Sequence, residues 1–463
     1  MNQLKINETE FDAVIIGGGP AGYNAAIHIA ELGGKACLIE KETLGGVCAK
    51  LGCIPTKTLL AKAALFETVQ EEAKKGIFLT IPLVDTFSLW KSAEEAAQKV
   101  QQGVSFLLSK QGVSLLLGKA VIKSISEVIV HFKNNESEII KTKNIIIATG
   151  SRPRLLPGTC LSSQVITSDQ ISQIFKRKVF PRSIVIVGAG YIGLEYASLF
   201  NTLGVNITII ENLPSLLPQE DQEVRSFLIK SLTKKNIKLL CNREVLLVEE
   251  KESKVKINVK NLQSGCSENI ETEILLVAIG REANFEAEEL QKIGLSFSRQ
   301  GIFTDKHMRT NLSSIYAIGD VAGKYQLAHI ATWEGLIAAK NIMGQRGVMD
   351  YSKVPKCIFT YPEIASVGVQ TKLQGKAFFL ANGKAIASGN INGFVKVYLE
   401  ENRIVGASII GNHASELIGV AIPLLGKDAL EVKEFIFPHP TLSEAILEAV
   451  HNALEQRTKI HSQ

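Results

Sequence analysis

Two stretches of the chain repeat one pattern of apolar and polar positions. Residues 11–40 read FDAVIIGGGPAGYNAAIHIAELGGKACLIE, and residues 182–211 read RSIVIVGAGYIGLEYASLFNTLGVNITIIE. Each begins with a short apolar run rich in β-branched residues, which predicts a buried strand. A glycine-rich turn, an alanine-rich helical pattern, a glycine break and a second apolar run follow. The pattern predicts two βαβ units, and therefore an α/β fold with two Rossmann-like domains.

Both units carry the spacing G-x-G-x-x-G after the first strand and a glutamate at the end of the second. The first glycine permits a tight turn, the second lets a pyrophosphate approach, and the third lets helix and strand pack closely. The terminal carboxylate can accept both hydroxyls of an adenosine ribose. Tight turns alone would leave these acids unexplained. The residues are Gly17, Gly19, Gly22 and Glu40 in the first unit and Gly188, Gly190, Gly193 and Glu211 in the second.

Two dinucleotide sites in one chain indicate a flavin and a nicotinamide cofactor. We expect the first unit to bind FAD and the second to bind NAD. A carboxylate at Glu211 favours a free 2′-hydroxyl and repels a 2′-phosphate, so NAD is preferred over NADP.

Three further segments fit this arrangement. We interpret IIIATGSRP (145–153) as the segment in which the chain leaves the first domain. We interpret LLVAIGREAN (275–284) as the segment in which it leaves the second domain. In SSIYAIGDVAG, an aspartate follows a predicted strand. It is either a turn-forming residue or a carboxylate that binds the ribityl hydroxyls of the flavin. The candidate cofactor-binding residues of these segments are Thr149, Gly150, Gly280 and Asp320.

The stretch LGGVCAKLGCIPTK (44–57) holds Cys48 and Cys53 with four residues between them. In an ideal α-helix, residues five apart lie about 8–9 Å apart at Cα, and a disulfide spans at most about 7 Å. A bonded pair therefore needs a distorted helix start, for which Gly52 and Pro55 are suited. A metal site would need more ligands in register, and no second close cysteine pair exists. Plain core cysteines are the remaining alternative.

Composition narrows the classes of function. Among 463 residues the formal charge is only +5, aromatic residues make up 6%, and no run of lysine and arginine exceeds three residues, so nucleic-acid binding is not expected. No apolar run reaches the roughly 18 residues of a membrane span, and the start MNQLKINETEFD lacks a signal core. Seven scattered cysteines argue against a disulfide scaffold. We expect a soluble, cytoplasmic protein.

Together these motifs resemble the pyridine nucleotide–disulfide oxidoreductases. GGVCAKLGCIPTK is similar to their redox-active disulfide motif, and ATG, GxGxxGxE, IGD and HPTLSE follow in the family's order over almost the whole chain. ENLPSLLPQED, FTYPEIASVGV and GNHASELI are most similar to members that oxidise protein-bound dihydrolipoyl groups with NAD⁺. A glutathione- or mercuric-reductase-like enzyme is the alternative, although Glu211 argues against NADPH. A non-catalytic paralogue that binds FAD is a second, more distant alternative.

The resemblance implies roles for four residues around the flavin. Cys48 is the outer sulfur that exchanges disulfides with the substrate. Cys53 is the inner sulfur that exchanges electrons with the flavin as a thiolate. Lys57 is expected near the flavin, paired with Glu195 of the second nucleotide unit. The alternative for Lys57 is a solvated lysine on a helix. The alternative for Glu195 is an ordinary polar residue on a helix.

The resemblance also implies a base. Thiol substrates must lose protons, and His439, in FPHPTLSEAILEA, is the expected acceptor, oriented by Glu444. Thr441 and Glu444 also have the spacing of a capping box, so local capping is the alternative for Glu444. In the family this histidine reaches the cysteines of the second subunit, which implies a homodimer.

The expected organisation has four segments. They are an FAD domain with the redox disulfide (1–152), an NAD domain (153–280), a central FAD-completing segment (281–350) and an α+β dimer-interface domain (351–463). No lipoyl domain precedes the first nucleotide unit, so we expect the lipoyl group on another protein. That partner would be the acyltransferase core of a 2-oxo acid dehydrogenase complex or a glycine-cleavage carrier.

Three features depart from the family's pattern. Val47 replaces the usual threonine before the first cysteine, and Phe437 stands where a histidine is common. The segment after Thr371 is shorter than usual, so a surface helix is expected to be trimmed.

Overall fold

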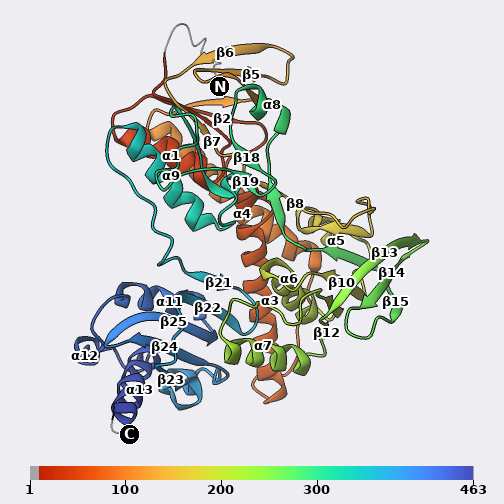
Figure 1. The fold of residues 1–463 in the computed structure, drawn as a ribbon. Helices are drawn as coiled ribbons and strands as arrows, with labels where there is room; N and C mark the ends of the chain where they lie inside the picture. Colours follow the sequence, from red (N-terminus) through yellow and green to blue (C-terminus); the bar gives the residue numbers. More distant parts are fainter. Residues whose placement is uncertain (1–9, 462–463) are drawn as a thin grey trace.

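The structure is a computed structural model that describes residues 10–461, with the side chains of 459–461 left out. Most of the segment that was expected to lack a signal core, residues 1–9, lies outside the described residues. Three bodies surround the long helix α3 (Cys53–Lys74). In Figure 1 the first domain lies at the top, the second domain to the right of α3 and the C-terminal domain to its lower left. Mixed α/β architecture with parallel sheets confirms the predicted fold class.

The first domain is built on a parallel sheet of five strands in the order β20-β7-β1-β2-β3. Strand β20 comes from the predicted central segment, far along the chain from its neighbour β7. Helices α1 and α9 pack against each other beside the sheet (Figure 1). The strands are β1 (Ala13–Ile16), β2 (Ala36–Glu40), β3 (Ser114–Leu117), β7 (Ile145–Ile147) and β20 (Ile315–Ala317), and the helices are α1 (Pro20–Glu31), α2 (Gly46–Lys50), α4 (Thr86–Lys110) and α9 (Ala328–Ile342).

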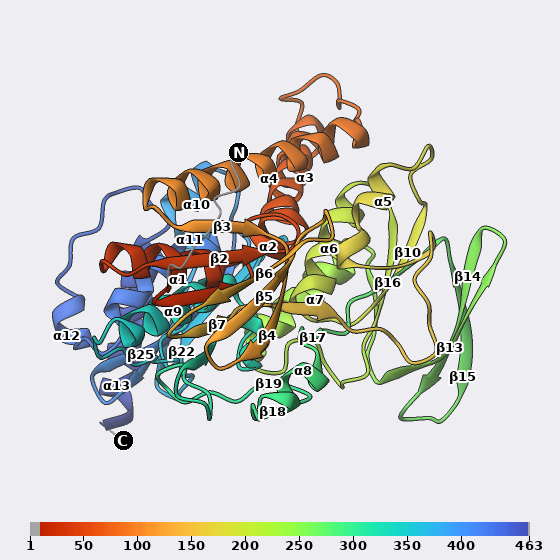
Figure 2. The ribbon, with the colours of Figure 1, turned by 90° about the horizontal axis from the view of Figure 1, so that it is seen from above.

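A helical hairpin and several smaller elements complete this domain. The long helices α3 and α4 pack together as a hairpin that projects from the domain when it is seen from above (Figure 2). Asp85 caps α4 by accepting hydrogen bonds from two backbone N–H groups of its first turn. The remaining elements are β4 (Lys119–Ser124), β5 (Glu127–His131), β6 (Ser137–Lys141), α8 (Ala287–Lys292), β18 (Phe297–Ser298), β19 (Gly301–Ile302) and the 3₁₀ turn η2 (Gly319–Ala322).

The second domain repeats the design with a parallel sheet in the order β12-β11-β10-β16-β9. An antiparallel three-stranded sheet, β13-β14-β15, lies at its outer edge (Figure 2). The elements are β9 (Val165–Thr167), η1 (Ser168–Gln170), α5 (Ser172–Phe175), β10 (Ser183–Val187), α6 (Tyr191–Thr202), β11 (Asn206–Ile210), α7 (Gln222–Lys234), β12 (Lys238–Leu240), β13 (Arg243–Lys251), β14 (Lys254–Asn261), β15 (Ser267–Thr272) and β16 (Ile274–Val277).

Two short antiparallel strands join these domains. β8 (Ser151–Pro153) carries the chain out of the first domain, and β17 (Arg281–Ala283) carries it back. The predicted divisions at residues 152 and 280 fall on or beside these strands. The exact domain boundaries stay a prediction.

The C-terminal domain is an antiparallel sheet in the order β21-β22-β25-β24-β23, covered by helices α11 and α13. The segment predicted to be short runs directly from β22 into β23. The elements are β21 (Lys356–Ile358), β22 (Glu363–Gly368), β23 (Gln374–Phe378), η3 (Phe379–Ala381), α10 (Gly383–Ala387), β24 (Phe394–Glu400), β25 (Arg403–Gly411), α11 (Ala414–Ala421), η4 (Ile422–Leu424), α12 (Ala429–Val432) and α13 (Glu444–His461).

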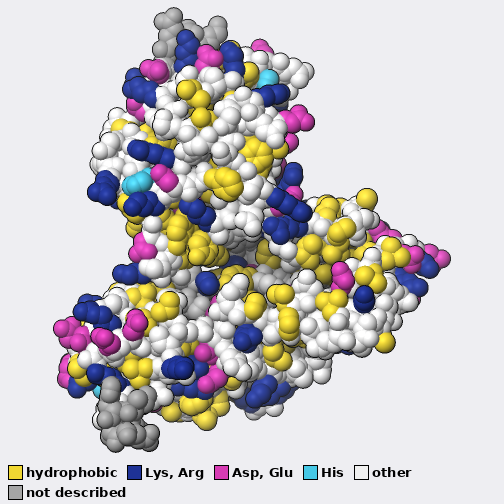
Figure 3. All heavy atoms as spheres, viewed as in Figure 1, with side chains coloured by type: hydrophobic (Ala, Val, Ile, Leu, Met, Phe, Trp, Pro, Cys, Tyr) yellow, Lys and Arg dark blue, Asp and Glu magenta, His cyan; other side chains and the backbone are white. Residues whose placement is uncertain are grey.

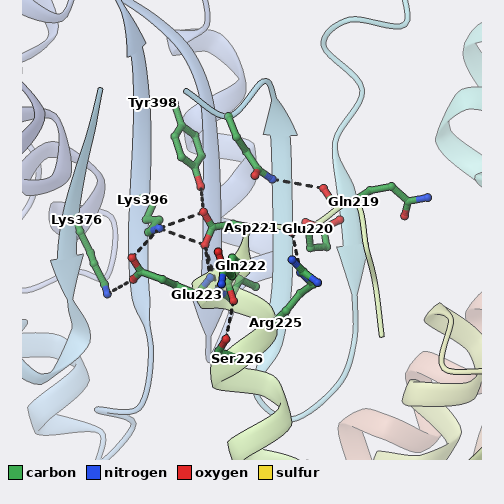
Figure 4. Close-up of polar contacts among 12 residues, drawn as sticks. Gln219, Glu220, Asp221, Gln222, Glu223, Arg225, Ser226, Lys376, Lys396 and Tyr398 are labelled. Atoms are coloured by element: carbon green, nitrogen blue, oxygen red, sulfur yellow. Dashed lines mark hydrogen bonds and ion pairs between the residues drawn. The ribbon is translucent and has the colours of Figure 1, made fainter. Parts of the chain in front are cut away.

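A buried ion cluster joins the second domain to the C-terminal domain (Figure 4). Asp221 caps α7 and accepts hydrogen bonds from Nζ of Lys396 at 3.0 and 3.1 Å and from the hydroxyl of Tyr398 at 2.9 Å. Lys396 also lies 3.2 Å from Glu223, whose other oxygen contacts Lys376. Because the lysine side chain is only 3% exposed, the carboxylates replace the water that it loses on folding.

The surface is hollowed between the first domain and the C-terminal domain (Figure 3). Among the described residues, no helix is long and apolar enough to cross a membrane.

Candidate active site

The two glycine-rich turns hold their acids in the same way. In the first domain, the backbone N–H of Gly18 donates to Oε2 of Glu40 at 2.7 Å. In the second, the N–H of Ala189 donates to Oε2 of Glu211 at 2.7 Å. The other oxygen of each carboxylate accepts the N–H two residues further along, at 2.7 and 2.9 Å. The predicted repeat is therefore a repeat of local structure.

The first and third glycines of each turn have the conformation and the close packing that the G-x-G-x-x-G spacing predicts. A Cβ on Gly22 would lie 1.8 Å from the carbonyl oxygen of Gly17, and one on Gly193 would lie 2.0 Å from that of Gly188, so helix and turn touch there. Gly17 and Gly188 have φ of +111° and +107°, a region that favours glycine.

The middle glycines face space instead. A Cβ on Gly190 would meet nothing within 4 Å, and one on Gly19 would only approach Gly46 at 3.9 Å. Both are N-cap residues of helices, α1 and α6, whose first turns receive no side-chain cap. Free N–H groups beside open space fit the pyrophosphates of two dinucleotides.

The chain segments that leave the two domains contact each other. The hydroxyl of Thr149 donates to the carbonyl oxygen of Asn284 at 2.6 Å, and the side-chain amide of Asn284 donates back at 3.1 Å. Gly150 and Gly280 have φ of +73° and +104°. The two predicted exits thus form one junction next to the first nucleotide turn.

Asp320 lies in the turn η2, directly after β20. Its Oδ2 accepts a hydrogen bond from the hydroxyl of Ser151 at 2.5 Å, and Ser151 in turn accepts one from Nε of Arg281 at 2.8 Å. Burial raises the pKa of Asp320, opposed by these two partners. The aspartate therefore belongs to a hydrogen-bonded network at the carboxyl end of β20, in addition to its position in a turn.

The two cysteines lie on separate helices. Cys48 is in the short helix α2, and Cys53 is the first residue of α3. The helical path breaks at Gly52, whose N–H donates to the carbonyl oxygen of Val47 at 2.7 Å. This break is the distortion that a bonded pair requires. Pro55 lies in the first turn of α3, where its missing N–H costs little.

The redox segment is fixed against the first nucleotide turn. The N–H of Gly45 donates to the carbonyl oxygen of Gly18 at 2.8 Å. A Cβ on Gly46 would lie 2.8 Å from Cα of Gly19. The cysteines are therefore held next to the turn that is expected to bind FAD.

Cys48 and Cys53 are both free, partly buried cysteines in this structure. The hydrogen bond from Cys48, with help from the charge of Lys57, lowers the pKa of Cys53 to about 7 against the opposing effect of burial. The same hydrogen bond, together with burial, raises the pKa of Cys48. These opposite shifts favour Cys53 over Cys48 as the thiolate of the pair when both sulfurs are reduced. Their roles in turnover stay predictions.

Lys57 and Glu195 form the ion pair that the resemblance implies. Nζ of Lys57 donates to both carboxylate oxygens of Glu195, at 2.8 and 3.0 Å. The glutamate also accepts the N–H of Phe359 at 3.1 Å, and the lysine lies 4.6 Å from the centroid of that ring. All three parts of the molecule therefore meet at this carboxylate.

His439 lies in the C-terminal domain with its side chain 76% exposed. Its Nδ1 lies 2.9 Å from Oε1 of Glu444, while Oε2 of Glu444 accepts the N–H of Thr441 at 2.7 Å. The hydroxyl of Thr441 donates to the carbonyl oxygen of Pro438. Glu444 thus contacts the imidazole and supports the helix start at once, so the two interpretations of this residue are compatible.

The structure adds residues that the sequence did not single out. Phe359 contacts both members of the ion pair. The motif that contains it, FTYPEIASVGV, supported the family resemblance, but no role was predicted for this residue. Ser151 directly follows the ATG motif and holds Asp320. Thr56 shares a 3.0 Å hydrogen bond with Tyr196 beside the cysteines. Among the described residues, no group of histidine, cysteine, aspartate and glutamate could hold a metal ion.

The fold and the site define an oxidoreductase that combines two dinucleotide-binding domains with a thiol pair. The family model of the pyridine nucleotide-disulphide oxidoreductases matches residues 11–335, and the model of the family's dimerisation domain matches residues 354–450. The chain belongs to this family. FAD and NAD are accordingly its cofactors, and the two glycine-rich turns are suited to hold them.

Several relatives carry one name. The chain is 39% identical over 449 residues to the dihydrolipoyl dehydrogenase of Chlamydia pneumoniae, covering 94% of this chain and 95% of the relative. It is 37% identical over 464 residues to that of Bacillus subtilis, covering 95% and 97%. Among solved structures, LpdA from Mycobacterium tuberculosis has a TM-score of 0.86 at 24% identity, covering 95% and 99%, which supports the fold.

Proposed function

We propose that this enzyme oxidises protein-bound dihydrolipoyl groups with NAD⁺, the activity for which its relatives are named. One observation carries the proposal furthest. The two thiols, with Cys53 favoured as the thiolate, are fixed against the first nucleotide turn and next to the ion pair that reaches the second domain. Glu211 supports NAD as the acceptor, because a carboxylate at the ribose disfavours a 2′-phosphate.

The exchange begins with the oxidised pair. A substrate thiolate attacks Sγ of Cys48, the bond to Cys53 breaks, and Cys53 leaves as a thiolate. The second substrate thiolate then displaces Sγ of Cys48, which closes the lipoyl disulfide and leaves both cysteines reduced. When bound, FAD supplies the two-electron path from Cys53 to NAD⁺, so the products are the lipoyl disulfide, NADH and one proton.

Proton transfer falls to His439. Its imidazole takes the protons that the substrate thiols lose and returns one to Cys48 when this sulfur leaves. The contact between Nδ1 and Oε1 of Glu444 orients the ring. Because the described hydrogen bonds of His439 lie within the C-terminal segment, we assign the contact with the cysteines to a second copy of the chain in a homodimer. The match to the dimerisation domain supports this arrangement.

The dihydrolipoyl group belongs to a partner protein in this proposal. The candidates are the acyltransferase core of a 2-oxo acid dehydrogenase complex and a glycine-cleavage carrier. Both would bring the substrate on a swinging arm to Cys48 in the cytoplasm.

The proposed reaction is tested by steady-state reduction of NAD⁺ with dihydrolipoamide, run beside reduction of glutathione disulfide with NADPH. We expect turnover in the first assay and little in the second. Activity only in the second would overturn the substrate assignment.

The shared site is tested by mixing two inactive variants, His439→Gln and Cys48→Ser. Heterodimers contain one site with both defects and one site with neither, so we expect activity to return. Verified heterodimers that stay inactive would contradict a site shared between subunits.

A further inference from the structure

A buried glutamate lies behind the turn that carries Asp320. Glu334, on helix α9, is 1% exposed. Its Oε2 accepts the backbone N–H of Gly319 at 2.6 Å, and its Oε1 accepts the hydroxyl of Tyr351 at 2.6 Å. Each carboxylate oxygen therefore has one short hydrogen bond, and neither partner is charged. Burial of an acid with only two neutral partners costs free energy. The carboxylate is therefore a candidate for a specific role at this position.

The turn that Glu334 holds is closely packed at Gly319. Gly319 has φ of +73°, and a Cβ there would lie 3.1 Å from Cβ of Ala21 and 3.4 Å from Cβ of Ala331. Residues of both α1 and α9 therefore pack closely against Gly319. The hydrogen bond from Gly319 fixes the peptide directly before Asp320, while Ser151 fixes the side chain of Asp320 from the other side.

The second partner of Glu334 comes from a different segment. Tyr351 lies between α9 and β21, on the stretch that leads into the C-terminal domain. Its ring stacks on Tyr325 with centroids 5.3 Å apart, and Nζ of Lys324 lies 5.5 Å from its centroid. Tyr325 and Lys324 follow the Asp320 turn directly. Tyr351 is thereby held against the same turn that Glu334 supports.

The surroundings of Glu334 shift the pKa of this acid and of Tyr351. Burial raises the pKa of Glu334, and its hydrogen bonds with Tyr351 and Gly319 and the charge of Lys324 oppose this effect. Tyr351 has its own pKa raised by burial and by the adjacent carboxylate, so it remains a donor. In this geometry one oxygen of Glu334 accepts from Gly319 and the other accepts from Tyr351.

We infer that Glu334 is a positioning residue for flavin binding, which acts through the Gly319–Asp320 turn and is itself set by Tyr351. The inference rests on the assignment of FAD to the first domain. Loss of the Glu334 carboxylate lets the turn relax, so that Asp320 no longer presents its carboxylate to the ribityl hydroxyls. A glutamine keeps one acceptor for Gly319 and one donor for the Tyr351 oxygen, so it preserves the geometry.

The test measures FAD binding to full-length apoprotein by quenching of FAD fluorescence. Hydrogen bonds to a charged group account for roughly 10- to 100-fold in a binding constant, so Glu334→Ala should weaken FAD binding by that factor. Tyr351→Phe should weaken it by about 2- to 10-fold, because one neutral donor is lost. Glu334→Gln should stay within about 3-fold of wild type. Ser352→Ala, at the exposed neighbour of Tyr351, is the matched control and should change nothing.

Two further measurements separate positioning from general stability. The melting temperatures of the apoproteins identify any variant that is merely misfolded, and Tyr351→Phe and Glu334→Gln then carry the test. In an Asp320→Asn background, Glu334→Ala should lose much less affinity than in wild type, because the two act through one contact. Additive losses, or an FAD affinity of folded Glu334→Ala equal to that of wild type, would overturn the inference. Wild-type protein that binds no FAD would instead overturn the cofactor assignment.

Discussion

Nζ of Lys57 lies 2.8 Å from one carboxylate oxygen of Glu195 and 3.0 Å from the other. The lysine lies one turn after Cys53 on α3, and the glutamate lies on α6, the helix of the second βαβ unit. Glu195 is 7% exposed at its side chain and also accepts the N–H of Phe359. The pair therefore places a positive charge beside the inner cysteine and ties together the first, second and C-terminal domains.

Replacing this lysine should affect both chemistry and stability. In Lys57→Met, the buried Glu195 loses its counter-charge. Because the lysine itself is one-third exposed, we expect a loss of about 1–3 kcal/mol in the free energy of unfolding, below the cost of breaking a fully buried pair. The pKa of Cys53 should rise, since Lys57 helps to lower it. Chemical denaturation and thiolate absorbance measure the two effects.

The matched control is Lys50→Met. Lys50 lies on α2 in an exposed pair with Glu42 at 2.8 Å, so its removal should change stability by less than about 1 kcal/mol. Equal effects of the two substitutions would contradict a special role for Lys57.

Titration of the reduced enzyme should show one thiolate near neutral pH. The pKa of Cys53 is lowered to about 7, first by the hydrogen bond from Cys48. Its ionised form is therefore present above this pH and is lost as the pH falls through it. The pKa of Cys48 is raised, so this sulfur stays protonated over the same range. Ultraviolet thiolate absorbance of wild type and Cys53→Ser measures the difference, and a transition that survives in Cys53→Ser would reverse the assignment.

Removal of the carboxylate at Glu211 should shift cofactor preference. Glu211→Ala loses the group expected to bind the ribose hydroxyls, so kcat/KM for NAD⁺ should fall by roughly 10-fold or more. The value for NADP⁺ should fall less or rise, because repulsion of the 2′-phosphate is gone. Parallel assays with both nucleotides give the ratio, with the exposed Glu249→Ala as control. An unchanged ratio would place the ribose elsewhere.

The ion cluster between the second and C-terminal domains should be costly to break. In Lys396→Met, the carboxylates of Asp221 and Glu223 lose their buried partner, so the free energy of unfolding should fall by about 3–5 kcal/mol. Lys254→Met, which removes one member of an exposed pair with Glu271, is the control and should cost less than about 1 kcal/mol. Denaturant unfolding compares them, and equal losses would show that the cluster contributes no more than a surface pair.

Local sequence signals predicted much of this structure because their causes are local. The glycine spacing and the acids fix a turn and two hydrogen bonds within some twenty residues, and both copies have the expected form. The broken helix at Gly52 followed from the reach of a disulfide. The pairing of Lys57 with Glu195 came from resemblance alone, because the two residues are far apart in the chain and charge pairing leaves no local pattern.

Other features could not be predicted from one sequence for the same reason. Glu334 stands in an alanine-rich helix, and only the packing of α9 against α1 shows that it is buried beneath the Asp320 turn. Lys396 lies among apolar residues of β24, and its partners at the start of α7 become evident only when the domains meet. Long-range contacts between polar residues determine both, and periodicity carries no information about them.

The central claim is that electrons pass from the substrate dithiol through the paired cysteines to NAD⁺. The most direct measurement is formation of NADH from dihydrolipoamide by three FAD-loaded proteins: wild type, Cys48→Ser and Cys160→Ser. Cys160 is exposed and lies outside the site, so its variant should match wild type. Cys48→Ser should form no NADH while keeping its bound FAD, whereas substantial turnover by Cys48→Ser would contradict the account.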